Sequence, residues 1–193
     1  MNHLSDPPRR RFLHRASRLG ALAAGAGSAL ALPMVATPAR AMLAGPRRLS
    51  LVHTHTGEKL ALVFAVDAHY APAALSALDH FLRDHYAGVV GCIDPQLFDL
   101  LYRVQQTLGQ EGPFEIISGY RASVTNDWLR ESRGGGGVAR HSLHLEGRAI
   151  DLRLPGVPLA DLHQAALSLR AGGVGFYPRD QFVHLDTGHV RNW

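Results

Sequence analysis

Residues 142–151 read SLHLEGRAID, a stretch that sets His144 and Asp151 seven residues apart across a glycine. Imidazole nitrogens and carboxylate oxygens are common zinc ligands. Further along, residues 182–186 read FVHLD, an alternating segment typical of a short strand, and this segment carries His184. We expect these three side chains to bind one zinc ion and leave its fourth position open for water. That arrangement is typical of catalytic zinc, whereas structural sites are usually closed by four protein ligands rich in cysteine.

Spacing alone is a modest signal, because a chain with 12 histidines places metal-capable residues at workable distances by chance. Amide hydrolysis at such a site needs two further parts. One is a general base for the water, and the other is a positive group or hydrogen-bond donor for the oxyanion. The apolar segment 114–117 runs into the polar turn Ser118-Gly119-Tyr120-Arg121, and a strand end holds a side chain rigidly. Arg121 is therefore the candidate for the oxyanion.

The first 41 residues have the pattern of an export signal. Three arginines at residues 9–11 precede an apolar run of small residues, which ends in Ala39-Arg40-Ala41. This combination is typical of a twin-arginine signal and predicts cleavage after Ala41. The alternative is a retained membrane anchor, which the short run, interrupted by Pro33, fits less well.

Removing this signal changes the charge of the protein. The whole chain has a net charge of +4, but six of its 20 basic residues and one of its 16 acidic residues lie in residues 1–41. The mature domain, residues 42–193, therefore has 14 basic and 15 acidic residues and a net charge of −1. Without a long basic run, it offers no nucleic-acid surface. We expect one periplasmic domain with no membrane insertion after cleavage.

Hydrophobic periodicity predicts an α+β domain with a small central antiparallel sheet and flanking helices. A Thr-Gly-Glu-Lys turn predicts a hairpin. The expected strands are residues 49–52, 60–64, 114–117, 148–154, 174–177 and 181–186, and the expected helices are residues 75–86, 95–108 and 158–169. Four glycines at residues 134–137 predict a flexible loop.

Several residues outside the main pattern carry weaker predictions. His53 and His55 share one face of the first expected strand and could bind metal, or could form a solvated strand end without a third ligand nearby. His85 is expected to be a partly exposed residue of the first helix. Cys92, the single cysteine, excludes an intrachain disulfide, and its apolar neighbours predict a buried side chain.

Three stretches carry a family resemblance. They read SGYRASVTNDWLR at 118–130, GVARHSLHLEGRAIDLRLPGV at 137–157 and GGVGFYPRDQFVHLDTGHVRNW at 172–193. Together they resemble the murein endopeptidase K type of periplasmic zinc peptidase. That type lies within the superfamily that includes the D-Ala-D-Ala carboxypeptidases and the hedgehog fold. The resemblance extends from the hairpin near Leu49 to Trp193, and its S-x-H-x-x-G-x-A-x-D motif followed by V-H-x-D is specific.

The resemblance implies a fold, a site and a substrate. It implies a hedgehog and DD-peptidase-like zinc-binding fold, zinc ligands at His144, Asp151 and His184, and a substrate or oxyanion contact from Arg121. The implied substrate is peptidoglycan, and the implied bond is an amide of the peptide cross-link, with a preference for the bond between two diaminopimelate residues.

One departure concerns the general base. Many relatives in the superfamily have an acid three residues before the last histidine ligand, and this chain has Gln181 there. A glutamine amide does not accept a proton at neutral pH. His189 and His141 are the first candidates for the base, because the free pKa of histidine lies near working pH; Asp180 and Glu146 follow. Separately, Asp186 is placed to orient a ligand, since it shares a strand face with His184.

Three functions remain open on the sequence. The favoured one is a zinc-dependent murein endopeptidase that acts on wall cross-links. A carboxypeptidase that trims the end of the stem peptide would use the same zinc and Arg121. A wall-binding module that keeps the metal but lacks catalysis is compatible with Gln181.

Overall fold

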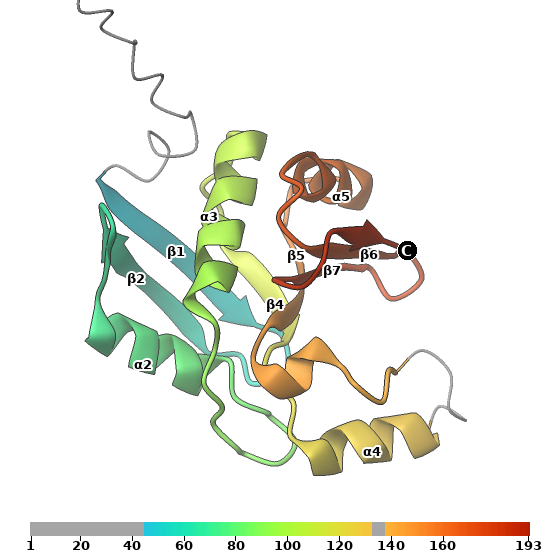
Figure 1. The fold of residues 1–193 in the computed structure, drawn as a ribbon. Coiled ribbons are helices and arrows are strands. Elements are labelled where there is room, and N and C mark those ends of the chain that lie inside the picture. The colour runs from blue at the N-terminus through green and yellow to red at the C-terminus, as the bar shows by residue number, and fades with distance from the viewer. Residues whose placement is uncertain (1–44, 133–137) are drawn as a thin grey trace, which may run out of the picture. The chain divides into compact units, whose positions relative to one another are not determined.

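The computed structural model describes residues 45–132 and 138–193. Within these ranges eight strands form one sheet, in the order β3-β2-β1-β4-β5-β7-β6-β8 (Figure 1). The strands are β1 Pro46–His53, β2 Lys59–Val66, β3 His69–Tyr70, β4 Phe114–Ser118, β5 Ala149–Arg153, β6 Gly173–Tyr177, β7 Phe182–Asp186 and β8 Arg191–Asn192. The predicted signal and the predicted glycine loop at residues 134–137 lie outside the described residues.

The sheet is larger than the small antiparallel sheet that we expected, and it is mixed. The β1–β2 hairpin is confirmed, but β4 pairs with β1 in parallel, as β8 does with β6. The β1–β4 pair is parallel because two helices bring the chain back between β2 and β4, whereas a tight turn would have reversed its direction. Strands β3 and β8 have two residues each, which is too short for any periodicity.

Four α-helices accompany the sheet in the described residues: α2 Pro72–Phe81, α3 Pro95–Leu108, α4 Ser123–Ser132 and α5 Leu159–Ser168. Helix α3 has the predicted bounds, because Asp94 accepts a hydrogen bond from the Gln96 amide at its start and Gly109 ends it with φ 61°. Helix α4 was not predicted. Its buried residues are polar, Thr125 and Asn126, so it lacks the apolar stripe that marks a helix in sequence.

The expected extension of helix α2 to Tyr86 is wrong. The helix ends at Phe81, and Asp84 then turns the chain. The Asp84 carboxylate accepts hydrogen bonds from the amides of Tyr86 and Ala87 through one oxygen, and from the Ala122 amide through the other. Asp84 therefore holds the loop between α2 and α3 against the start of α4.

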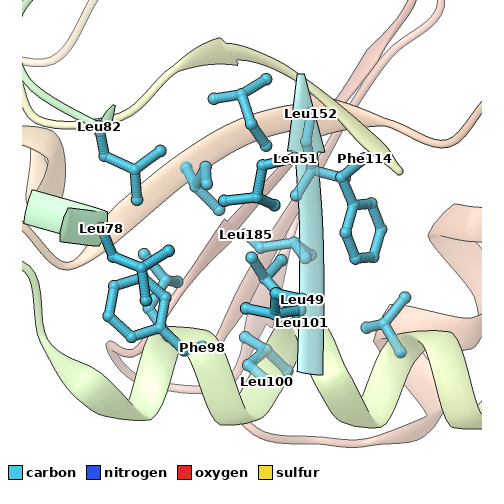
Figure 2. Close-up of a cluster of buried hydrophobic side chains, with 14 of the residues drawn as sticks. Leu49, Leu51, Leu78, Leu82, Phe98, Leu100, Leu101, Phe114, Leu152 and Leu185 are labelled. Atoms are coloured by element: carbon cyan, nitrogen blue, oxygen red, sulfur yellow. The ribbon is translucent and has the colours of Figure 1, made fainter. Parts of the chain in front are cut away.

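The hydrophobic core lies on one face of the sheet (Figure 2). Leu152 and Leu185 belong to it, whereas Asp151 and His184, which alternate with these leucines, point to the other face. Helices α3 and α5 contact each other and pack against the strands. The alternation in β5 and β7 thus separates a core face from a site face.

Two further features bear on the sequence predictions. Cys92 is exposed, so its predicted burial is wrong; it lies in the irregular segment before α3, where the next residue, Ile93, is the one that enters the core. Across the part of the chain that the structure describes, every helix is too short or too polar to span a bilayer.

Candidate metal centre

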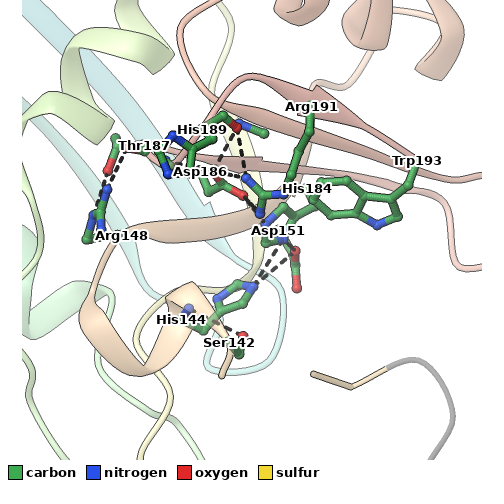
Figure 3. A network of polar contacts seen from close by, with 12 residues as sticks. Ser142, His144, Arg148, Asp151, His184, Asp186, Thr187, His189, Arg191 and Trp193 are labelled. Carbon is green, nitrogen blue, oxygen red and sulfur yellow. Dashed lines mark hydrogen bonds and ion pairs between the residues drawn. The ribbon is translucent and has the colours of Figure 1, made fainter. Parts of the chain in front are cut away.

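His144, Asp151 and His184 come together at the buried end of the site face (Figure 3). The Nε2 atom of His144 lies 3.3 Å from Nδ1 of His184 and 3.3 Å from Oδ1 of Asp151. Nδ1 of His184 lies 2.8 Å from the same Asp151 oxygen. Among the described residues, this is the one group of three or more metal-ligating side chains with its ligand atoms this close.

His144 is held by a short 3₁₀ helix, η1, Leu143–Glu146. Gly147 ends the helix with φ 67°, in the left-handed region that favours glycine. A Cβ on Gly147 would lie 1.9 Å from the carbonyl oxygen of Cys92, and the Gly147 carbonyl accepts a hydrogen bond from the Asp94 amide. The glycine of the SLHLEGRAID motif therefore packs η1 against the start of α3.

The other two residues face each other across a strand pair. Strands β5 and β7 are antiparallel, and their register pairs Asp151 with His184 directly. Directly opposed residues in an antiparallel pair have neighbouring side chains on one face. The SLHLEGRAID and FVHLD motifs are separated by a helix in the sequence, but their residues Asp151 and His184 lie on neighbouring strands of the sheet.

Hydrogen bonds on the outer edges of the two rings fix their orientation. Nδ1 of His144 lies 2.7 Å from the Gly119 carbonyl, which only accepts, so this nitrogen donates and Nε2 is left with its lone pair toward Asp151. Nε2 of His184 lies 3.2 Å from Oδ2 of Asp186. Asp186 in turn accepts from Arg191 and the Gly173 amide.

The cluster is electrostatically coupled. Burial lowers the pKa of His144. Burial also acts to lower the pKa of His184, but hydrogen bonds to Asp151 and Asp186 outweigh it and raise the pKa to about 9. Burial acts to raise the pKa of Asp151, yet the neighbouring histidines hold it well below its usual range.

The donor set fits a zinc ion. Two imidazole nitrogens and one carboxylate oxygen face one point, and tetrahedral zinc ligands with bonds of about 2.0–2.2 Å lie roughly 3.3–3.6 Å apart. The observed separations of 2.8–3.3 Å approach this range. The contacts of the rings with Gly119 and Asp186 are those by which metal-binding histidines are commonly oriented.

The cluster opens into a cavity of about 770 Å³. Arg121 lines this cavity, and its guanidinium lies 3.8 Å from Oδ2 of Asp151, on the side of the carboxylate away from the histidines. The Arg121 amide donates to the His144 carbonyl. The predicted oxyanion residue therefore lies beside the predicted metal ligands.

The structure separates the candidate general bases. His141 and Asp180 are exposed side chains that line the cavity. His189 is exposed and lies outside the cavity lining given by the described residues, and Glu146 pairs with Arg148 at 3.2 Å. Gln181 has a left-handed backbone, φ 58°, and its amide donates to the Pro178 carbonyl.

Other cavity residues escaped the sequence predictions. His85 was assigned to a helix, but it lies in the loop after α2 and lines the cavity together with His55. Tyr177 and Trp193 form a further part of the lining, with the Trp193 indole N–H donating to the Tyr177 hydroxyl at 2.7 Å. These contacts join segments that are far apart in the sequence, so no local sequence pattern predicts them.

Three buried side chains that could hold one metal ion, placed at the end of an open cavity, are the arrangement expected of a metal-dependent enzyme. The chain belongs to the peptidoglycan L,D-endopeptidase MepK family, whose model matches residues 41–193.

Curated relatives agree with this assignment. The chain is 47% identical over 181 residues to the peptidoglycan L,D-endopeptidase MepK of Escherichia coli K12, with 92% of this chain and 97% of that protein covered. It is 43% identical over 164 residues to a probable peptidoglycan L,D-endopeptidase MepK of Haemophilus influenzae, with 84% and 83% covered. No solved structure matches the chain, so the expected likeness to the hedgehog and DD-peptidase fold stays a prediction.

Proposed function

We propose that the protein is a zinc-dependent murein endopeptidase that hydrolyses amide bonds in the peptide cross-links of peptidoglycan, with a preference for the bond between two diaminopimelate residues. The observation that carries this proposal is the convergence of His144, Asp151 and His184 at the end of a cavity. Membership of the family supports the substrate class.

The cavity suits a substrate that continues on both sides of the cut bond. The lining includes residues of the loop after α2 and of α4, such as His85 and Leu129, and also residues of β6 and the chain end, such as Tyr177 and Trp193. A cross-link has a peptide strand on each side of its amide. An endopeptidase needs this two-sided arrangement.

A zinc ion held by the three ligands would polarise the scissile carbonyl and lower the pKa of water toward neutrality. Arg121 would bind the oxygen on which negative charge develops, because its guanidinium is a permanent cation with several donors. The position of Arg121 beside Asp151 supports this role, because a guanidinium there could contact the same scissile carbonyl that the zinc ion would polarise.

For the general base we propose His141, with Asp180 as the alternative. Both line the cavity, whereas His189 does not. An imidazole changes protonation near neutral pH, so His141 can take a proton from water and return it to the leaving amine.

Export by the twin-arginine route and cleavage after Ala41 would place the enzyme in the periplasm, where its substrate lies.

Product analysis tests the proposal against its alternatives. Purified protein with zinc is incubated with cross-linked muropeptide dimers, and the products are separated by chromatography with mass detection. Conversion of dimers to monomers is expected. Release of terminal D-alanine alone would indicate a carboxypeptidase, and zinc binding without any cleavage would indicate a wall-binding module.

A further inference from the structure

Four ring side chains form a continuous row along the lining of the cavity and onto helix α4. The rings of His55 and His85 stack with centroids 4.2 Å apart and planes 10° apart. His85 contacts Tyr86 at 4.1 Å, and Tyr86 contacts Trp128 of α4 at 5.4 Å. We call these four residues the aromatic row.

His85, at the middle of the row, is half-buried, whereas His55, Tyr86 and Trp128 are exposed. His55, His85 and Tyr86 line the cavity, and Trp128 continues the row beyond that lining. Tyr86 is 56% exposed and Trp128 is 52% exposed. Large aromatic side chains with this much exposure present apolar ring surface to water, which usually marks a binding site.

The surroundings of the outer end are also apolar. The described part of the chain has eight large exposed hydrophobic side chains, and five belong to the loop after α2 or to α4: Tyr86, Val89, Val90, Val124 and Trp128. Asp84 joins these two segments through its bond to the Ala122 amide. The aromatic row therefore lies on a surface formed by the loop after α2 and helix α4, and the hydrogen bond of Asp84 ties these two segments together.

None of the four rings carries a permanent charge. Burial, together with the neighbouring His55, lowers the pKa of His85, which disfavours a charge on its ring. Tyr86 and Trp128 add ring faces with polar groups only at their edges, the hydroxyl and the indole N–H. A partner with flat C–H faces and hydroxyl groups at its rim matches this surface better than an anion or a charged peptide does. A pyranose ring has this form.

The proposed substrate supplies such a ring. Each stem peptide of peptidoglycan is attached to an amino sugar, and an extended peptide spans at most roughly 3.3–3.6 Å per residue. A sugar a few residues from the cut bond therefore lies just outside the cavity. We propose that the aromatic row is a saccharide subsite, in which a sugar stacks on Trp128 and Tyr86 while the peptide passes His85 toward the metal ligands. This inference rests on the proposed function.

The test compares two forms of one substrate. Cross-linked muropeptide dimers are used with their disaccharides attached and after removal of the sugars by an amidase. The zinc-loaded protein should cleave the disaccharide form with a kcat/KM about tenfold higher. In Trp128→Ala this ratio should fall to about one, and Trp128→Tyr, which keeps a ring, should retain most of the preference.

Val66→Ala is the control, because Val66 is 49% exposed and lies on β2, away from the cavity lining. It should leave the ratio unchanged. The inference is overturned if the parent protein shows no preference, or if Trp128→Ala lowers kcat/KM equally for both forms, which would indicate a peptide contact.

A binding measurement keeps the inference testable even if the protein cleaves neither form and the proposed function fails. The chain has two tryptophans, so its NMR spectrum contains two indole N–H signals, assigned with Trp128→Ala. Titration with the free disaccharide should shift the Trp128 signal in a saturable manner. An unchanged Trp128 signal would overturn the inference.

Discussion

His184 and Asp186 lie two residues apart on β7, and Nε2 of the histidine meets Oδ2 of the aspartate at 3.2 Å. The opposite ring nitrogen, Nδ1, then faces Asp151 at 2.8 Å. Asp186 is fully buried and is fixed by the Gly173 amide and by Arg191. The aspartate therefore sets the direction in which the ring presents its inner nitrogen.

Asp186→Asn should weaken metal binding. An amide holds the His184 ring less firmly and lowers the basicity of its nitrogen, so zinc affinity should fall about 10–100-fold. Competition with a chromophoric chelator measures the affinity. Asp161→Asn, on the exposed surface of α5, is the control and should bind zinc as the parent does. Equal affinity in Asp186→Asn would show that the contact does not orient the ligand.

Arg121→Ala should reduce turnover while leaving the metal in place. Loss of one oxyanion partner costs roughly a hundredfold or more in kcat. Arg121→Lys should recover part of the activity, because it keeps the charge without the planar fork of donors. Steady-state kinetics and elemental analysis on the same samples give both quantities. Full turnover in Arg121→Ala would remove this residue from the proposed chemistry.

His141→Ala should lower kcat by roughly 10²–10⁴-fold if His141 is the general base. His189→Ala, which changes an exposed residue outside the described cavity lining, should retain the parent rate. The comparison uses dimer cleavage at several pH values with zinc saturating. Retained activity in His141→Ala together with a large loss in Asp180→Asn would transfer the role to the carboxylate.

His53 should make the protein less stable in acid. Its ring is 1% exposed, and burial, followed by the influence of His85 and His55, lowers its pKa to about 4. The unfolded chain, with a pKa of about 6.5, binds this proton more readily. The free energy of unfolding should therefore fall by about 3 kcal/mol as the pH drops from about 6.5 to about 4, and change little from this source below that.

His53→Asn should reduce this dependence. Nδ1 of His53 accepts hydrogen bonds from the His55 and Thr56 amides, and the side-chain oxygen of asparagine can accept them without titrating. Urea unfolding between pH 7 and pH 4 measures the slope. His69→Asn, at an exposed position of β3, should keep the parent slope, and an equally steep slope in His53→Asn would contradict the account.

The sequence predicted elements where local signals agree. Helix α3 has its aspartate cap, its proline and its terminal glycine, and β5 and β7 alternate between core leucines and site residues. Asp151 and His184 meet because these signals fix which face of each strand is buried, whereas His144 is brought to them by η1. Arg121 follows from the same logic, since it comes directly after a core strand.

The features that escaped prediction depend on contacts between distant segments. Helix α4 buries Thr125 and Asn126, so its inward face has no apolar pattern. Asp84 fixes the loop after α2 by accepting a hydrogen bond from an amide 38 residues away. His53 and His55 were expected to have no third ligand nearby; the contact of the His85 ring with both of them was not predicted, because the same loop creates it. The mixed sheet has a similar cause, because the parallel pairing of β4 with β1 depends on chain topology.

Elemental analysis of the purified protein tests the central claim most directly. The parent protein, His144→Ala and Asp151→Ala are compared, each shown by circular dichroism to be folded. One equivalent of zinc per chain in the parent, and its loss from both variants together with cleavage of cross-linked dimers, is the predicted result. A parent protein without metal, or a variant that keeps both its zinc and its activity, would contradict the site built from these residues.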